Sequence, residues 1–526
     1  MRKSRRRGPP AGFLDLMRLR NTILTGAASY IQMGSLMVTQ LVAIPLALRF
    51  LDNERFGLWS FTSQSLGYLL LLDFGVSTSI GRLLVEPLHQ GDEREWNGWF
   101  NLVLAIVSIQ AALILGLGLA LVEPILRWFN IPAALLPEAR QLWLMMLVLN
   151  ALTFPLKLFL GILYAQNRGY WIFMSQTVGA WAGLAAFYVF LQSGRGSLAY
   201  GFSAVAQSLV ASGLPLVAVV WGPNRFRLSI RGIPWHRARE LFGFSSAVFV
   251  IIVGVQVVFA SQSLIITKIL GLGAVASFAV CSKVPMLMLQ LIWRPFDAFS
   301  PRWQIYWSQG KTEELTREYR HLVRLSLGLA VLAMIGCFAM NRWFVVIFGK
   351  QSLYSGKPFD FFFAIFVLTQ VWIHCTACNF VLARRMKGFA AFFAADTVVA
   401  LSVAVLGTKW FGLTGYMAFT ALYSLLGINF WYVTLQAPRI LNISTGSLLK
   451  ESAGGLLFFP ALLLGGLFLF QQITDPVWLV AAESSLVVIA LVWFGISFWT
   501  DVQGMLVRLH RARQNRRDAK DAPPAV

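Results

Sequence analysis

Long apolar segments dominate the chain and recur about every 30 to 40 residues along its length. The first of them, residues 21–50, is long enough to cross the hydrocarbon core of a bilayer as a helix. Of the 526 residues, 57% are hydrophobic and only 13% are charged, which is more apolar than a water-soluble domain requires. Because lipid cannot satisfy backbone polar groups, the pattern predicts an all-α polytopic membrane protein.

Apolar segments of about 20 residues predict fourteen transmembrane helices. Their approximate starts are residues 23, 57, 97, 141, 170, 198, 243, 273, 321, 359, 388, 412, 451 and 476. An even number of spans places both termini on one side, and the loops on that side carry about three times as many Lys and Arg as the opposite loops. We therefore expect both termini in the cytoplasm. The net charge of +21 then belongs mostly to segments flanking the membrane, so lipid headgroups rather than nucleic acid are the expected partner.

An internal repeat is visible when the chain is shifted by 219 residues. The shift places Arg49 on Lys268 and Trp59 on Phe278, and it also aligns residues 163–170 with residues 382–389. Because this period contains six spans, the two halves share one orientation in the membrane. The repeat predicts two six-helix lobes related by a pseudo-two-fold axis along the membrane normal, plus two extra C-terminal helices.

The predicted layout has seven parts. They are a basic cytoplasmic N-terminal segment (1–22), an N-lobe with six spans (23–221), a basic cytoplasmic linker (222–242), a C-lobe with six spans (243–436), a cytoplasmic loop (437–450), two further spans (451–500) and a basic cytoplasmic tail (501–526).

Sequence motifs for catalysis and cofactor binding are missing from the chain. No DxD, Walker, GxSxG or HExxH motif occurs, and the longest predicted external connection has about eighteen residues, so we expect no enzyme, no catalytic residues, no metal site and no cofactor. Nothing resembles the repeated filter of a channel. The cysteines fall within apolar segments, where packing is the expected role: Cys281, Cys337, Cys375 and Cys378.

Positive charges inside or at the ends of spans predict an anion-binding cavity. Lys157 and Lys283 lie deep in predicted spans, Arg294 lies near the inner end of one, and Arg49 and Lys268 lie at span ends. Ammonium and guanidinium groups can replace the hydration of a diphosphate, so all five are candidate substrate-binding residues. Simpler roles stay open, because the lysines could snorkel or pair structurally and the residues at span ends could be interfacial anchors.

Embedded carboxylates are candidates for gating or for ion coupling. They are Asp73, Asp297 and Asp396. Asp297 could instead neutralise Arg294 three residues away, and Asp73, which precedes a close-packing glycine, could bond to a neighbouring span. Glu483 lies in the appended pair of spans, where a local partner is the expected role.

Several short patterns follow one another in the region of the first two spans. They are Asn21, then P-L-x-x-R-x-L from Pro45 to Leu51, then E-R-F-G-L-W from Glu54 to Trp59, and then D-x-G with a following arginine, here Asp73, Gly75 and Arg82. This order resembles the opening of the bacterial oligosaccharide flippases that carry O-antigen and exopolysaccharide units. These proteins form the polysaccharide-transporter branch of the multidrug/oligosaccharidyl-lipid/polysaccharide exporter superfamily.

The resemblance implies a flippase in the bacterial inner membrane. Such a protein would move an undecaprenyl-diphosphate-linked oligosaccharide from the cytoplasmic to the periplasmic leaflet by alternating access. It also suggests the polymerase and glycosyltransferases of the glycan pathway as partners. Two alternatives of the same superfamily stay open, namely a cation-coupled multidrug antiporter and a lipid II flippase.

Overall fold

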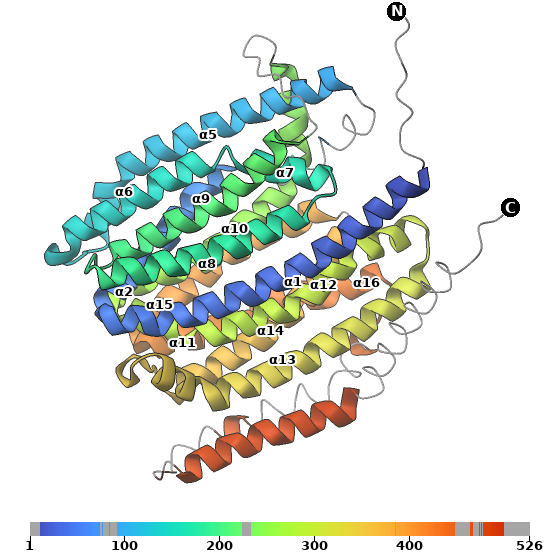
Figure 1. Ribbon diagram of the computed structural model, residues 1–526. Helices are drawn as coiled ribbons and strands as arrows, with labels where there is room; N and C mark the ends of the chain where they lie inside the picture. The colour runs from blue at the N-terminus through green and yellow to red at the C-terminus, as the bar shows by residue number, and fades with distance from the viewer. Residues whose placement is uncertain are drawn as a thin grey trace, which may run out of the picture. The chain divides into compact units, whose positions relative to one another are not determined.

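The computed structural model describes residues 11–73, 76, 84, 92–222, 233–383, 385–447, 463–466, 473, 475 and 477–498. Helices and short 3-10 turns account for the regular structure of these residues, and no strand occurs among them (Figure 1). The predicted all-α class is therefore confirmed for the part of the chain that is described. A helix satisfies its own backbone hydrogen bonds, which is what an apolar segment in lipid requires.

The chain divides into two compact units, Met1–Ala279 and Val280–Val526. The first contains α1 (Ala11–Phe50), α2 (Asn53–Leu69), η1 (Leu70–Asp73), α5 (Glu93–Trp128), η2 (Ala133–Leu135), α6 (Leu136–Thr153), α7 (Lys157–Ala165), α8 (Tyr170–Gln192), α9 (Leu198–Val220), η3 (Trp235–Arg237) and α10 (Ala238–Leu270). Helix α11 (Leu272–Cys281) crosses the boundary. The second contains α12 (Lys283–Ser308), α13 (Thr312–Phe348), η4 (Gln351–Leu353), α14 (Lys357–Leu382), α15 (Met386–Leu426) and α16 (Ile428–Ile440), followed by a C-terminal helix, Val477–Phe498.

Ten of the described helical segments are long and apolar enough to cross a membrane, or eleven when the bent pair α11 and α12 counts as one span. The predicted spans at residues 170 and 198 begin where α8 and α9 begin. The start of the span predicted at residue 451 lies outside the described residues. A multi-pass membrane protein is thus confirmed, whereas the count of fourteen, the seven-part layout and the pseudo-two-fold symmetry stay predictions.

Helix α15 contains the break that the sequence placed near residue 412. Phe411 and Gly412 have non-helical backbone angles, and Gly412 adopts a φ of 63°, which a side chain would disfavour. The 41-residue helix is therefore two helices joined at a kink, and the first of them, which ends before Phe411, is long enough to be a separate span.

Helix α5 shows how the spans meet lipid. Ile109, Leu113, Leu117 and Leu121 are all exposed and follow one another at intervals of four residues. This spacing places them on one face of the helix, and hydrocarbon suits an exposed apolar stripe better than water does.

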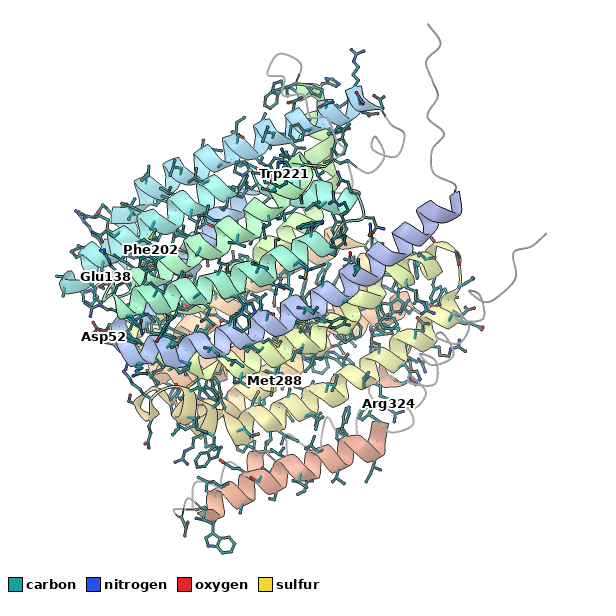
Figure 2. All side chains as sticks on the ribbon, viewed as in Figure 1. Asp52, Glu138, Phe202, Trp221, Met288 and Arg324 are labelled. Carbon is teal, nitrogen blue, oxygen red and sulfur yellow. The ribbon has the colours of Figure 1, made fainter. Side chains whose placement is uncertain are left out.

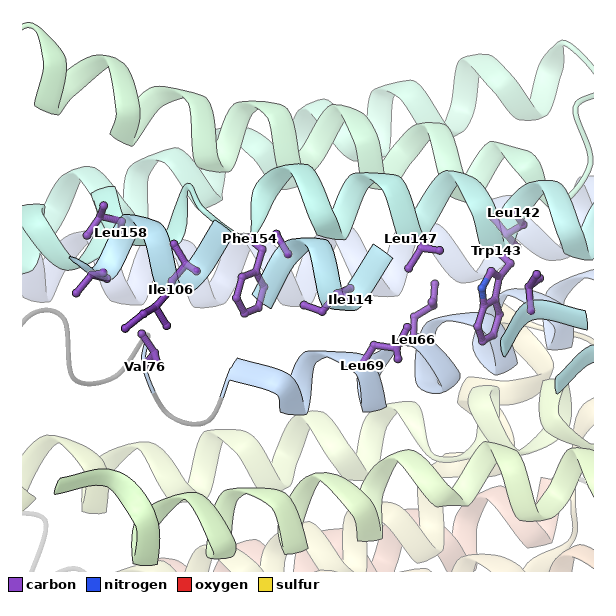
Figure 3. Close-up of a cluster of buried hydrophobic side chains, with 14 of the residues drawn as sticks. Leu66, Leu69, Val76, Ile106, Ile114, Leu142, Trp143, Leu147, Phe154 and Leu158 are labelled. Atoms are coloured by element: carbon purple, nitrogen blue, oxygen red, sulfur yellow. The ribbon is translucent and has the colours of Figure 1, made fainter. Parts of the chain in front are cut away.

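Buried side chains of α2, α5, α6 and α7 form the core of the first unit (Figure 3). Trp143 of α6 is completely buried there, and its indole nitrogen donates to the Gly118 carbonyl of α5 at 3.1 Å. Elsewhere in this unit, α1, α8 and α9 lie side by side (Figure 1). Ser203 of α9 donates to the Gly183 carbonyl of α8 at 2.8 Å, a close approach of the kind that small residues allow between membrane helices.

The C-terminal helix belongs to the core of the second unit. Leu479, Leu486 and Ala490 pack with buried residues of α13 and α14, and Figure 1 shows the helix in red beside α13. In Figure 2 Arg324 of α13 is labelled near one end of the C-terminal helix. Its guanidinium donates to the Ser497 carbonyl at 3.1 Å. A segment that falls outside the sequence repeat is therefore packed into the second unit.

Candidate functional site

Lys157 lies at a break in the middle of an apolar segment. Helix α6 ends at Thr153, Pro155 occupies the turn, and Lys157 is the first residue of α7. Proline cannot donate a backbone hydrogen bond and therefore interrupts a helix. The partly buried lysine has its ammonium 4.3 Å from the centroid of the Phe154 ring, which is cation–π geometry.

Lys283 lies at a similar break in the second unit. Helix α11 ends at Cys281, and Lys283 is the first residue of α12, with a 47° bend between the two helices. The side chain is partly buried. Both deep lysines are therefore the first residue of a helix that restarts within an apolar segment.

The other three predicted cations are exposed. Arg49 is in the last turn of α1, with its guanidinium 5.8 Å from the Phe50 ring centroid. Lys268 is in the last turn of α10, where its ammonium donates to the Trp128 carbonyl and lies near the Trp128 ring. Arg294 lies on α12, inside the helix. The contacts of Arg49 and Lys268 match the interfacial alternative, so these two are weaker candidates for substrate contact.

Of the three predicted carboxylates, the side chains of Asp73 and Asp297 lie outside the described residues. Asp396, in the first half of α15, accepts from the Tyr423 hydroxyl at 2.6 Å and from the Asn429 backbone N–H at 3.3 Å. Asn429 is the second residue of α16, so this carboxylate satisfies an N–H at a helix start. Asp396 therefore holds both sides of the break at Gly427.

The E-R-F-G-L-W pattern has a clear packing basis in the first unit. Arg55 donates from Nε to Glu138 at 2.9 Å and from a terminal nitrogen to Asp52 at 2.8 Å, and hydrogen bonding to Glu138 raises its pKa above the ordinary value. Asp52, in the turn between α1 and α2, and Glu138 of α6 are labelled close to each other in Figure 2. Glu138 also accepts from the Ser197 backbone N–H. This ion pair thus ties the start of α2 to α6 and to the loop before α9.

The remaining residues of the pattern bring α2 against its neighbours. Trp59 stacks on Tyr200 with ring centroids 4.3 Å apart, and Leu58 is completely buried. A Cβ on Gly57 would lie 2.0 Å from the Leu272 carbonyl oxygen, so only glycine fits where α2 meets the start of α11.

Polar side chains connect α2 and α10 along their length. The Ser60 and Ser263 hydroxyls are 3.3 Å apart, and the Tyr68 hydroxyl bonds to the Ser261 hydroxyl and to the Val257 carbonyl. We call this contact the α2–α10 seam. Hydroxyl pairs hold two membrane helices together with about 1 kcal/mol each or less, so such a seam can separate without exposing a charge.

A group of buried charges in the second unit is absent from the sequence-based candidates. Lys357 at the start of α14 pairs with Glu483 of the C-terminal helix, and the two side chains are 10% and 3% exposed. Asp360, one turn along α14, accepts from the Asn341 amide at 2.6 Å and from the Tyr354 hydroxyl at 2.6 Å. We call these five residues the Asp360 cluster. Glu483 has a structural partner as expected, but the partner is Lys357 of α14 rather than a residue nearby in the chain. Lys357 and Asp360 themselves were missed because they flank a predicted span start.

No group of three or more potential metal ligands occurs among the described residues. All four cysteines are free thiols, and three are buried, as packing residues would be.

Comparison with known proteins gives the chain its family. Residues 19–302 match the family described as polysaccharide biosynthesis protein. The uncharacterized membrane protein EpsK of Bacillus subtilis (strain 168) is 24% identical over 428 residues, covering 78% of this chain and 82% of that protein.

Two solved structures share the fold at low sequence identity. The inward closed lipid II flippase MurJ superimposes with a TM-score of 0.67 at 12% identity, covering 91% of this chain and 99% of that one. An inward-facing multidrug resistance MATE family transporter of the MOP superfamily gives 0.66 at 11% identity, covering 78% and 98%. With the family match spanning more than half of its length, the chain belongs to the polysaccharide biosynthesis protein family, as the pattern in its first two spans predicted.

Proposed function

We propose that this protein translocates an undecaprenyl-diphosphate-linked oligosaccharide across the bacterial inner membrane, from the cytoplasmic to the periplasmic leaflet. Membership of a polysaccharide biosynthesis family with a transporter fold supports a glycan cargo. The observation that carries the proposal further is the placement of Lys157 and Lys283, each inside an apolar segment and each at the first residue of a restarted helix.

This placement suits a lipid-linked diphosphate. The anion must leave bulk water when its lipid moves between leaflets, and a lysine inside an apolar segment offers an ammonium that can replace part of its hydration. An embedded lysine costs about 2.5 to 3.5 kcal/mol on insertion scales, so its retention in an apolar segment favours a functional role. In this proposal the two lysines contact the diphosphate, and Arg294, Arg49 and Lys268 are secondary contacts.

Alternating access requires helices that can separate on one side of the membrane. The α2–α10 seam meets this requirement, because its hydroxyl pairs can exchange partners with water or with lipid headgroups. We assign the seam as a gate that opens during transport. Both termini lie in the cytoplasm in this proposal, and the end of α2 that carries Arg55 faces the periplasm. The proposed neighbours in the membrane are its lipids and the glycosyltransferases and polymerase of the same glycan pathway.

Deletion of the gene tests the proposal. Undecaprenyl-linked repeat units should accumulate on the cytoplasmic face, and surface polysaccharide should be lost. Complementation with Lys283→Gln should restore protein in the membrane but not surface polysaccharide, whereas Lys311→Gln, which alters an exposed loop lysine, should restore both.

Two outcomes of the same experiment contradict the proposal. Full-length surface polysaccharide in the deletion strain, with no second flippase present, would exclude this cargo. Sensitivity of that strain to organic cations would then favour the multidrug antiporter, and arrest of cell-wall synthesis would favour the lipid II flippase. Normal polysaccharide export by Lys283→Gln would remove this lysine from the site.

A further inference from the structure

The Asp360 cluster contains one more carboxylate than lysine in a buried setting. Asp360 is 1% exposed, and Glu483 and Lys357 are nearly as buried. Lys357 Nζ is already committed to Glu483 and to the Phe338 carbonyl at 2.8 Å. Fully ionised, the three groups would carry one uncompensated negative charge. Burying an unpaired charge costs several kcal/mol, and a carboxylate in this position avoids the cost by binding a proton.

The neighbours of Asp360 suit a carboxyl group that changes its protonation state. One oxygen accepts from the Tyr354 hydroxyl, which can also act as an acceptor, and the other accepts from the Asn341 amide. Asn341 is 2% exposed, and its own carbonyl oxygen has no hydrogen-bond partner. Rotation of this amide by a half turn would present that oxygen to a protonated carboxyl group. The cluster thus has a spare acceptor for the donor that a bound proton supplies.

The polar and titratable groups around Asp360 come from several elements. Helix α14 supplies Lys357 and the C-terminal helix supplies Glu483. The segment after α13 supplies Tyr354, α13 supplies Asn341 and the Cys337 thiol, and α11 supplies the Cys281 thiol, which donates to the Leu353 carbonyl. Only Lys357 is cationic among these groups, and its partner is Glu483.

We propose that the Asp360 cluster is a proton-binding site that holds one proton on Asp360 while Lys357 neutralises Glu483. The proton comes from water through Tyr354, which is partly exposed in the segment between α13 and α14. A sodium ion fits less well, because both Asp360 oxygens already accept hydrogen bonds and the Lys357 ammonium, one turn away on α14, would repel a second cation. The site lies wholly within the second unit and does not depend on the proposed cargo.

Infrared spectroscopy of the purified full-length protein tests whether Asp360 carries a proton. A protonated carboxyl group has a carbonyl stretch that a carboxylate lacks, and ¹³C labelling of aspartate shifts the band only when the acid is an aspartate. At neutral pH the wild type should show one aspartic acid band that Asp360→Asn removes. The control Asp52→Asn, which alters an exposed carboxylate, should leave the band in place.

Two more variants change the number of protonated carboxyl groups in the cluster, one lowering it and the other raising it. Glu483→Gln should also remove the band, because Lys357 then neutralises Asp360 instead. Lys357→Met should add a second acid band, which ¹³C labelling of glutamate shifts. Size-exclusion profiles show whether each variant is folded, and the wild-type labelling experiment needs no variant. An aspartic acid band that survives Asp360→Asn at full strength, or that survives Glu483→Gln, would overturn the proposal, as would a wild type without the band.

Discussion

Two ion pairs, one in each unit, show how differently the same chemistry works at the surface and in the interior. In the first unit Arg55 pairs with Glu138, and the side chains are 41% and 16% exposed. In the second unit Lys357 pairs with Glu483, and they are 10% and 3% exposed. Water screens the first pair and can solvate either partner when the other is lost. The second pair has no such alternative, so breaking it leaves a buried charge.

The two regions also differ in how their residues are gathered. Arg55, Phe56, Gly57 and Trp59 lie within one turn and a half of α2, so a short pattern in the sequence records them together. The Asp360 cluster draws its residues from α13, the segment after it, α14 and the C-terminal helix. The short sequence motif in α2 therefore records residues that pack tightly together. The buried charges of the Asp360 cluster come from separate segments and leave no such motif.

Lys357→Met should have the largest effect of the changes we predict. It leaves Glu483 buried without a counter-charge, so the free energy of unfolding should fall by about 3–5 kcal/mol. At neutral pH Glu483 must bind a proton to avoid the buried charge, and the loss should shrink as the pH falls, because that protonation then costs less free energy. Thermal unfolding of the purified protein in detergent across a pH series measures both effects.

The double variant Lys357→Met/Glu483→Leu is the matched control for that prediction. It removes both charges together and should recover most of the stability. A single variant as stable as the wild type would show that the interior pair behaves like a surface pair, and the comparison would fail.

Gly57→Ala should have an intermediate effect. The added Cβ would meet the Leu272 carbonyl oxygen at 2.0 Å, and because that atom belongs to the backbone, α2 must move. We expect a loss of about 1–3 kcal/mol, measured by the same unfolding assay. Gly26→Ala in α1 is the control, since a Cβ there meets nothing within 4 Å, and it should not lower stability, because alanine is the better helix former. Equal stability of the two variants would contradict a packing role for Gly57.

Removal of the Arg55–Glu138 interaction should have the smallest effect. A double-mutant cycle with Arg55→Gln and Glu138→Gln should give a coupling energy of about 0.2–1 kcal/mol. Unfolding measured at low and at high salt should show this energy decreasing with ionic strength, because the pair is partly exposed. A coupling energy as large as the loss in Lys357→Met, or one insensitive to salt, would erase the distinction between the two regions.

Much of the fold could be predicted because membrane helices are encoded locally. The starts of α8 and α9 and the break at Gly412 follow from the lengths of apolar segments and from helix-breaking residues. The deep lysines could be found as well, since a charge in an apolar segment is conspicuous in one dimension. That each begins a helix was not foreseen.

Contacts between distant segments could not be predicted in the same way. Asp360 and Lys357 lie at the edge of an apolar segment, where a charge is ordinary, and their burial depends on α13 and the C-terminal helix covering them. Asp396 was singled out for its depth, but its bond to the start of α16 depends on how α15 folds back.

The sequence by itself determined the helical class, the membrane environment, the family and the presence of embedded lysines. Each of these depends on residues close together in the chain, where apolar length, charge and helix-breaking residues act locally. Only the tertiary structure decided that Gly57 meets Leu272, that Tyr68 meets Ser261, and that Lys357 neutralises Glu483 beside Asp360. The physical reason is that hydrogen bonding, burial and charge balance depend on distances in space, which helix packing sets and sequence separation does not record.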